Sequence, residues 1–137
     1  CPGKRVINIA GDGSFRMNLN ELATAVEYDL PIIVVIMNNH ALGMVRQWQS
    51  IFYGKRYSHS NLERQTDFVK LAEAFGAVGY NLTEKKDVVP ILKEALAINR
   101  TVVINCEIDR EHKVWPMVPP GAALEEVIVG ESDLIRN

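Results

Sequence analysis

Runs of apolar residues alternate along the whole chain with segments of helical periodicity. The runs at residues 6–10, 32–37 and 102–108 predict strands, and a shorter one at residues 77–81 predicts a fourth. Residues 32–37 include no polar residue, which is typical of a strand covered on both faces and therefore of a parallel sheet. Residues 6–10 are also expected to form a buried strand, closed by a tight turn at residues 11–13.

The segments between these runs have the spacing of amphipathic helices. Helices are predicted at residues 17–28, 43–53, 67–75 and 86–98, with Ser14, Thr66 and Thr83 as caps and a polar loop at residues 54–65. The alternation of strand and helix predicts an α/β domain with an open, mostly parallel sheet and helices on both faces.

A proline-rich segment follows the last predicted strand, and a short apolar helix is expected at residues 122–129. We therefore expect one domain over residues 1–137, in which residues 109–137 form a C-terminal arm. The chain opens at Cys1 without an initiating methionine or a signal-like segment, which suggests a fragment of a longer chain.

Composition narrows the function classes. Of the 137 residues, 15 are Lys or Arg and 17 are Asp or Glu, so there is no basic excess to favour nucleic acid as a partner. The longest apolar run, residues 31–37, is about a third of the roughly 20 residues that cross a bilayer, which argues against a membrane partner. Two cysteines, Cys1 and Cys106, make no disulfide framework, so a reducing compartment is expected, with Cys106 buried in its strand.

Polar residues close two neighbouring predicted strands. Asp12 lies in a Gly-Asp-Gly motif after the first strand, and Asn39 follows the second, with 24 residues between Gly13 and Asn38. One crossover helix and one strand fit this interval, so Asp12 and Asn39 should lie roughly 5 to 10 Å apart at one edge of the sheet. Sparse oxygen ligands of this kind suit Mg²⁺, because phosphate oxygens and water then complete its coordination shell. The sequence thus predicts a metal-linked phosphate site, to which amides near Ser14 and Gly43 also point.

Each motif is weak alone, because Gly-Asp-Gly is common in turns and neither dinucleotide nor P-loop glycine patterns occur. Together, however, Gly-Asp-Gly, the interval and Asn-Asn at residues 38–39 resemble the diphosphate and Mg²⁺ signature of thiamine diphosphate enzymes. The segments GDGSFRMN (11–18), ELATA (21–25), GMVRQWQ (43–49) and PMVPPGA (116–122) are similar to catalytic subunits of acetohydroxyacid (acetolactate) synthases. The resemblance covers essentially the whole chain and implies the C-terminal, diphosphate-binding domain of a protein several times longer.

The resemblance assigns roles to individual residues. It implies that Mg²⁺ is held by Asp12, the side chain of Asn39 and the backbone carbonyl of Ala41. The implied cofactor-binding residues are Gly11, Asp12, Gly13, Ser14, Asn39, Ala41, Gly43 and Met44. The implied substrate channel consists of Met44, Val45, Trp48 and Phe52, where Trp48 would favour a larger second 2-ketoacid. The glutamate that activates the cofactor in this family is expected outside the chain, so the catalytic residue stays unknown.

The activity implied by the resemblance is condensation of pyruvate with pyruvate or 2-ketobutyrate in branched-chain amino acid biosynthesis. The fragment alone is expected to be inactive; the full-length protein would carry FAD, mainly outside these residues, and form a homodimer or homotetramer, with a regulatory small subunit as a further partner. The expected compartment is the cytoplasm, or a plastid or mitochondrion in a eukaryote. Two alternatives stay open: another decarboxylating thiamine diphosphate enzyme, of the pyruvate oxidase or glyoxylate carboligase type, and a non-catalytic binding or assembly module.

Overall fold

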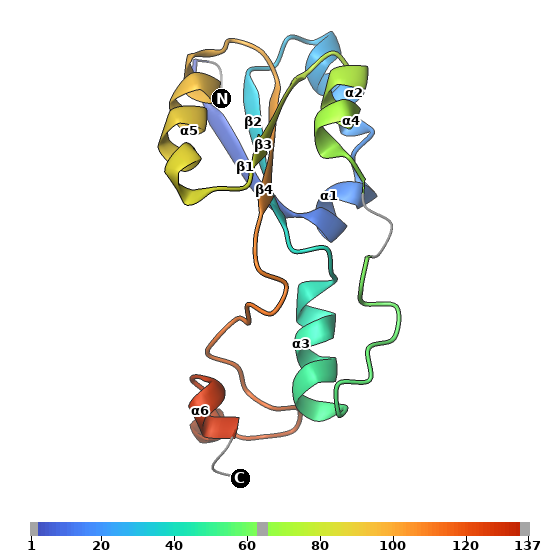
Figure 1. The fold of residues 1–137 in the computed structure, drawn as a ribbon, viewed down its shortest axis with the longest axis vertical. Coiled ribbons are helices and arrows are strands. Elements are labelled where there is room, and N and C mark those ends of the chain that lie inside the picture. The colour runs from blue at the N-terminus through green and yellow to red at the C-terminus, as the bar shows by residue number, and fades with distance from the viewer. Residues whose placement is uncertain (1–2, 63–65, 135–137) are drawn as a thin grey trace. The chain divides into compact units, whose positions relative to one another are not determined.

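A computed structural model, which describes residues 3–62 and 66–134, has the predicted α/β architecture (Figure 1). In this part of the chain, β1 (Val6–Gly11), β2 (Ile32–Asn38), β3 (Val78–Leu82) and β4 (Val102–Glu107) form one parallel sheet. Their order is β1-β2-β4-β3. Because the strands are parallel, their carboxyl ends meet at one edge, where ligands bind in open sheets of this class.

The helices differ from the predicted ones mainly at their ends. The α-helices are α1 (Asp12–Met17), α2 (Glu21–Glu27), α3 (Gly43–Phe52), α4 (Phe68–Ala74), α5 (Val88–Ala97) and α6 (Glu131–Leu134). The described residues also form two 3₁₀ turns, η1 (Lys85–Asp87) and η2 (Leu124–Glu126). The helix predicted at residues 17–28 is α2 alone, preceded by the separate helix α1, and the one predicted at 86–98 is η1 followed by α5.

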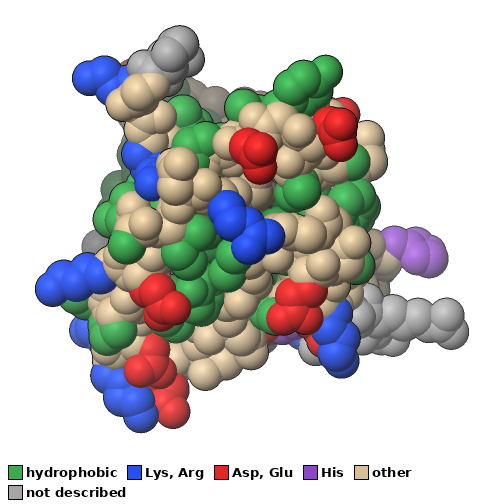
Figure 2. Space-filling view, turned by 90° about the horizontal axis from the view of Figure 1, so that it is seen from above, with side chains coloured by type: hydrophobic (Ala, Val, Ile, Leu, Met, Phe, Trp, Pro, Cys, Tyr) green, Lys and Arg blue, Asp and Glu red, His purple; other side chains and the backbone are tan. Residues whose placement is uncertain are grey.

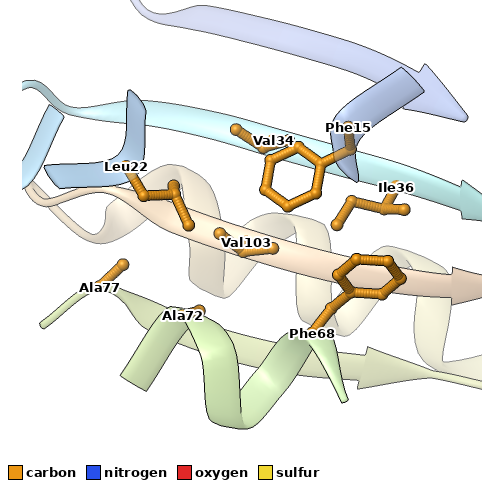
Figure 3. Close-up of a cluster of buried hydrophobic side chains, with 8 residues drawn as sticks. All are labelled: Phe15, Leu22, Val34, Ile36, Phe68, Ala72, Ala77 and Val103. Carbon is orange, nitrogen blue, oxygen red and sulfur yellow. The ribbon is translucent and has the colours of Figure 1, made fainter. Parts of the chain in front are cut away.

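Two apolar clusters cover the two faces of the sheet, as the predicted fold class requires. On one face, α1, α2 and α4 pack on β2 and β4. The buried residues of this cluster are Phe15, Leu22, Val34, Ile36, Phe68, Ala72, Ala77 and Val103 (Figure 3). On the other face, α5 packs on β2, β3 and β4 through Ile33, Leu82, Ala95, Val102 and Ile104. The uninterrupted apolar run at residues 32–37 of β2 is explained by this burial on both sides.

The expectation that β1 is buried is wrong. Its side chains at Val6, Ile7 and Ile9 are 46%, 48% and 71% exposed. β1 is an edge strand, and Ile9 stands opposite Val35, which packs in the cluster under α5. Ile9 is exposed because the cluster under α5 is formed by the other strands. This could not be predicted, since the composition of a single strand does not specify its place in the strand order.

The predicted helix caps are also wrong. α1 begins at Asp12 with Gly11 as its N-cap, so Ser14 lies inside the first turn. Asp67 caps α4, since its Oδ1 accepts a hydrogen bond of 3.0 Å from the N–H of Lys70. Glu84 occupies the cap position of η1. The three residues expected in these roles were Ser14, Thr66 and Thr83.

The chain divides into two compact units. The sheet unit comprises Cys1–Ala41 and Leu62–Arg110, and the arm unit comprises Leu42–Asn61 and Glu111–Asn137. In the arm unit, Gln47 on α3 makes two hydrogen bonds with the backbone of Val114. Its Nε2 donates to the Val114 carbonyl (2.9 Å), and its Oε1 accepts from the Val114 N–H (2.8 Å). The interpretation of residues 1–137 as one domain with an arm at residues 109–137 stays a prediction.

Two further expectations are corrected. Residues 122–129 do not form the predicted apolar helix: they contain η2 and end in an antiparallel bridge between Met117 and Ile128. Cys106 lies in β4 but is half-buried, near the sheet edge where the strands end, and its burial raises the pKa of its thiol. Cys1 lies outside the described residues.

Two observations concern the surface. Within residues 3–62 and 66–134, no helix combines the length and apolar character that a membrane crossing requires. On the face drawn in Figure 2, Lys and Arg side chains alternate with Asp and Glu, with hydrophobic side chains between them. This face has no field of a single sign, which agrees with the formal net charge of −2.

Candidate functional site

Adjacent parallel strands bring Asp12 and Asn39 to the same edge of the sheet. Gly11, the last residue of β1, stands opposite Met37 of β2, so Asp12 lies one residue beyond this pair and Asn39 two residues beyond it. Neighbouring strands are about 4.8 Å apart. Both polar residues therefore leave the sheet at neighbouring points of its carboxyl edge, within the sheet unit.

The carboxylate of Asp12 is buried and incompletely paired. The residue is only 1% exposed, and its Oδ2 has no hydrogen-bond partner among the described residues. Burial raises the pKa of Asp12 above its ordinary value, although the Arg16 guanidinium one helical turn later acts in the opposite direction. An unpartnered buried carboxylate oxygen is costly and is the kind of atom that a cation satisfies.

Asn39 and Ala41 lie in a tight turn after β2. The N–H of Ala41 donates to Oδ1 of Asn39 (3.1 Å), and Arg110 Nε lies 3.4 Å from the Asn39 carbonyl oxygen. An amide oxygen has two lone pairs, so Oδ1 keeps one for a second partner. Among the described residues, no three His, Cys, Asp or Glu side chains gather as a metal-binding group. The donors at this edge are instead a carboxylate, an amide and backbone carbonyls, a set that suits a hard cation such as Mg²⁺.

The other residues predicted to contact the cofactor are divided between the two units. Gly11 ends β1, while Gly13 and Ser14 lie in the first turn of α1, where backbone N–H groups have no intrahelical acceptor. Gly43 and Met44 belong to the arm unit and open α3. The sheet unit thus carries all three predicted metal ligands and the turn of α1 that is predicted to bind phosphate.

The arm unit holds an apolar pocket of about 480 Å³ against one side of α3. Of the predicted channel residues, Met44, Val45 and Trp48 line it. Phe52 is not in the lining, but its ring meets that of Trp48 edge to face, with centroids 5.7 Å apart. The remaining lining residues were not predicted from the sequence; they are Gln49, Tyr53, Arg56 and Ser58.

A polar network at the ends of β2, β3 and β4 was also missed. Asn38 donates to Asn105 (3.0 Å), and Asn105 donates to Asn81 (2.7 Å) and to Glu107 (2.8 Å). Oε2 of Glu107 lies 2.6 Å from Nε2 of His40. The available signal was the pair of single asparagines, at positions 81 and 105, inside otherwise apolar strands. The network lines a polar pocket of about 560 Å³ in the sheet unit.

Comparison with known proteins gives a consistent result. Residues 1–106 match the family described as "Thiamine pyrophosphate enzyme, C-terminal TPP binding domain". Among solved structures, the fold is similar to the thiamine diphosphate-dependent 4-hydroxybenzoylformate decarboxylase of Rhodococcus jostii RHA1. The TM-score is 0.73 at 29% identity, over 79% of this chain and 20% of that one.

Several curated relatives are acetolactate synthases. The large subunit from Porphyra purpurea is 43% identical over 93% of this chain and 22% of its own length. The isozyme 2 large subunit of Escherichia coli (strain K12) is 42% identical, over 93% of this chain and 23% of its own. The acetolactate synthase of Mycobacterium bovis is 47% identical, over 92% of this chain and 21% of its own. The chain thus spans about a fifth of the length of the curated relatives it matches.

Proposed function

Because the chain belongs to the thiamine pyrophosphate enzymes and matches their C-terminal cofactor-binding domain, we propose that it holds Mg²⁺ and the diphosphate of thiamine diphosphate for an acetolactate synthase. The whole reaction would condense pyruvate with a second 2-ketoacid, pyruvate or 2-ketobutyrate, in branched-chain amino acid biosynthesis. The observation that carries this proposal is the buried, unpartnered Oδ2 of Asp12 at the edge where the Asn39 turn leaves the sheet.

The donors of the sheet unit fit the metal. Asp12, Oδ1 of Asn39 and the carbonyl of Ala41 would provide three oxygens with one negative charge, which leaves positions for diphosphate oxygens and water. The cation would make the carboxylate an anchor for an anionic cofactor instead of a source of repulsion. Backbone N–H groups of Gly13, Ser14 and Gly43 would donate to the diphosphate. Gly11 and Met44 are the further expected cofactor contacts. When bound, thiamine diphosphate supplies the electron sink for breaking and making the bond next to the carbonyl.

The pocket beside α3 is the proposed acceptor site. Its lining is apolar apart from Arg56, Gln49 and Ser58, which suits the short alkyl chain and the polar head of a 2-ketoacid. We further expect the activating glutamate to lie outside this chain and FAD to bind mainly outside it. A homodimer or homotetramer, a regulatory subunit, and a location in the cytoplasm, a plastid or a mitochondrion stay predictions of the same kind.

Calorimetry and product analysis test the proposal in the intact protein. We expect thiamine diphosphate to bind only with Mg²⁺ present, and acetolactate to form from pyruvate. No Mg²⁺-dependent binding would favour the non-catalytic module. Binding with acetate or tartronate semialdehyde as product would favour an enzyme of the pyruvate oxidase or glyoxylate carboligase type.

The substitution Trp48→Leu tests the acceptor pocket. Trp48 lines the pocket and its ring is fixed edge to face against Phe52, so a smaller side chain enlarges the space that selects the acceptor. We expect the ratio of acetohydroxybutyrate to acetolactate, measured with both 2-ketoacids present, to change roughly tenfold. Met17→Leu, at a 76% exposed position, is the control and should leave the ratio unchanged. An unchanged ratio in Trp48→Leu would remove Trp48 from the acceptor site.

A further inference from the structure

The turn that carries two of the proposed metal ligands has an unfavourable backbone conformation. His40, between Asn39 and Ala41, has φ of +54°. This left-handed region costs a residue other than glycine about 1–2 kcal/mol. Such a conformation persists only where surrounding contacts hold it. The contacts of His40 therefore bear directly on where the two ligands point.

Among the described residues, three hydrogen-bonding contacts hold His40. Its N–H donates to Oδ1 of Asn38 (3.2 Å), and its carbonyl accepts the N–H of Leu62 (2.9 Å). Its ring contributes the third, because Nε2 lies 2.6 Å from Oε2 of Glu107. The side chain of His40 is only 16% exposed and that of Glu107 is 32% exposed, so solvent only partly competes for this pair.

Glu107 connects the turn to the rigid part of the sheet. It stands opposite Asn38 in the β2–β4 register, and its Oε1 accepts from Nδ2 of Asn38 (3.2 Å) and from Nδ2 of Asn105 (2.8 Å). Asn105 is in turn bonded to Asn81 on β3. The Glu107 carboxylate therefore contacts both residues that flank Asn39, which are Asn38 and His40. Its own position is held by hydrogen bonds that connect β2, β3 and β4.

We propose that Glu107 is a positioning residue for Mg²⁺ binding, acting through His40 and Asn38 on the turn that presents Asn39 and Ala41. The proposal rests on the proposed function, because it assumes the metal at Asp12, Asn39 and Ala41. Glu107 itself does not touch the ion. Residues in this outer position orient the ligands, and their loss typically weakens metal affinity by about 10- to 100-fold.

The test is a calorimetric titration of Mg²⁺ into the intact protein at saturating thiamine diphosphate. Glu107→Ala should raise the Mg²⁺ concentration at half-saturation by about 10- to 100-fold. His40→Gly should have a similar effect, because the contact to Glu107 is lost and glycine, which adopts other backbone conformations as readily, leaves the turn without a fixed geometry. If the two residues act as one unit, the double variant should be no worse than the weaker single variant.

Rescue and control variants separate positioning from general stability. Glu107→Gln keeps an acceptor for the asparagine amides and can donate to Nε2 of His40, so it should restore most of the affinity. Glu94→Ala also removes a carboxylate held by a short hydrogen bond, 2.6 Å from the hydroxyl of Tyr80, but on α5, and should leave Mg²⁺ affinity unchanged. Circular dichroism identifies any variant that fails to fold. If Glu107→Ala fails to fold, the Mg²⁺ affinity of His40→Gly tests the positioning role instead.

The outcomes distinguish this inference from the function on which it rests. If the unaltered protein shows no Mg²⁺-dependent binding, the metal assignment and this proposal both fall. If the unaltered protein binds and Glu107→Ala binds within about twofold of it, the positioning role alone is overturned. Losses that multiply in the double variant would also overturn it, because they would show that Glu107 and His40 act separately.

Discussion

Replacing Asp12 by asparagine is expected to abolish Mg²⁺-dependent binding of thiamine diphosphate while stabilising the unliganded protein. The variant keeps the shape of the side chain but removes the charge that a cation requires. We expect the loss of cofactor affinity to exceed the roughly 100-fold that marks the upper end for residues outside the ligand shell. Calorimetry with thiamine diphosphate at fixed Mg²⁺ measures it, and unchanged affinity would contradict the metal assignment.

The stability of the same variant is expected to change with pH in a defined way. Burial raises the folded-state pKa of Asp12 above 3.8, so stability decreases as the pH rises from about 3.8 through that raised pKa. Asp12→Asn lacks this decrease and should be more stable above that range by about 1 kcal/mol, which is roughly 3 °C in Tm. Below it, the two proteins should agree. Asp29→Asn, an exposed position where asparagine tolerates φ of +47°, is the matched control.

Truncating Phe68 to alanine should cause the largest loss of stability. Phe68 is 1% exposed at the start of α4, and its ring packs edge to face on Phe15, with centroids 5.7 Å apart (Figure 3). The guanidinium of Arg16 lies over the same ring, 5.6 Å from its centroid. We expect a decrease of about 3–5 kcal/mol in the free energy of unfolding, and a fall of roughly 10 °C in Tm.

Urea unfolding followed by circular dichroism measures this loss. Leu124→Ala, at a position that is 80% exposed, should change the free energy of unfolding by less than about 0.5 kcal/mol. A change of similar size in both variants would mean that the cluster around Phe68 does not hold α1 and α4 on the sheet.

The sequence predicted the order of strands and helices because apolar periodicity reflects burial directly. Residues 32–37 were expected to be covered on both faces, and Ile33 and Ile36 are fully buried. The same reasoning failed for Ile9, since a β-branched apolar residue looks identical in a central and an edge strand. The predicted caps were wrong for another reason. Several neighbouring side chains can suit a cap position, and at α4 it is Asp67, next to Thr66, that accepts the hydrogen bond.

The candidate site was predictable only where its members lie at strand ends. Asp12 and Asn39 follow apolar runs, so their meeting at one edge follows from parallel topology. The contact between His40 and Glu107 spans 67 residues and depends on β2 and β4 being neighbours, which no local pattern specifies. Trp48 was predicted because its segment resembles a known family. Nothing in the sequence around Arg56 predicts that it lines a pocket.

The exposed strand β1 has a practical consequence for anyone who prepares these 137 residues alone. An unprotected edge with isoleucines on its surface is a template for pairing with other chains and hence for aggregation. Purification of the isolated polypeptide should therefore give concentration-dependent oligomers and precipitate. Lysine in place of Ile9 is the change that would best keep it dispersed, because a charge on an edge strand discourages such pairing.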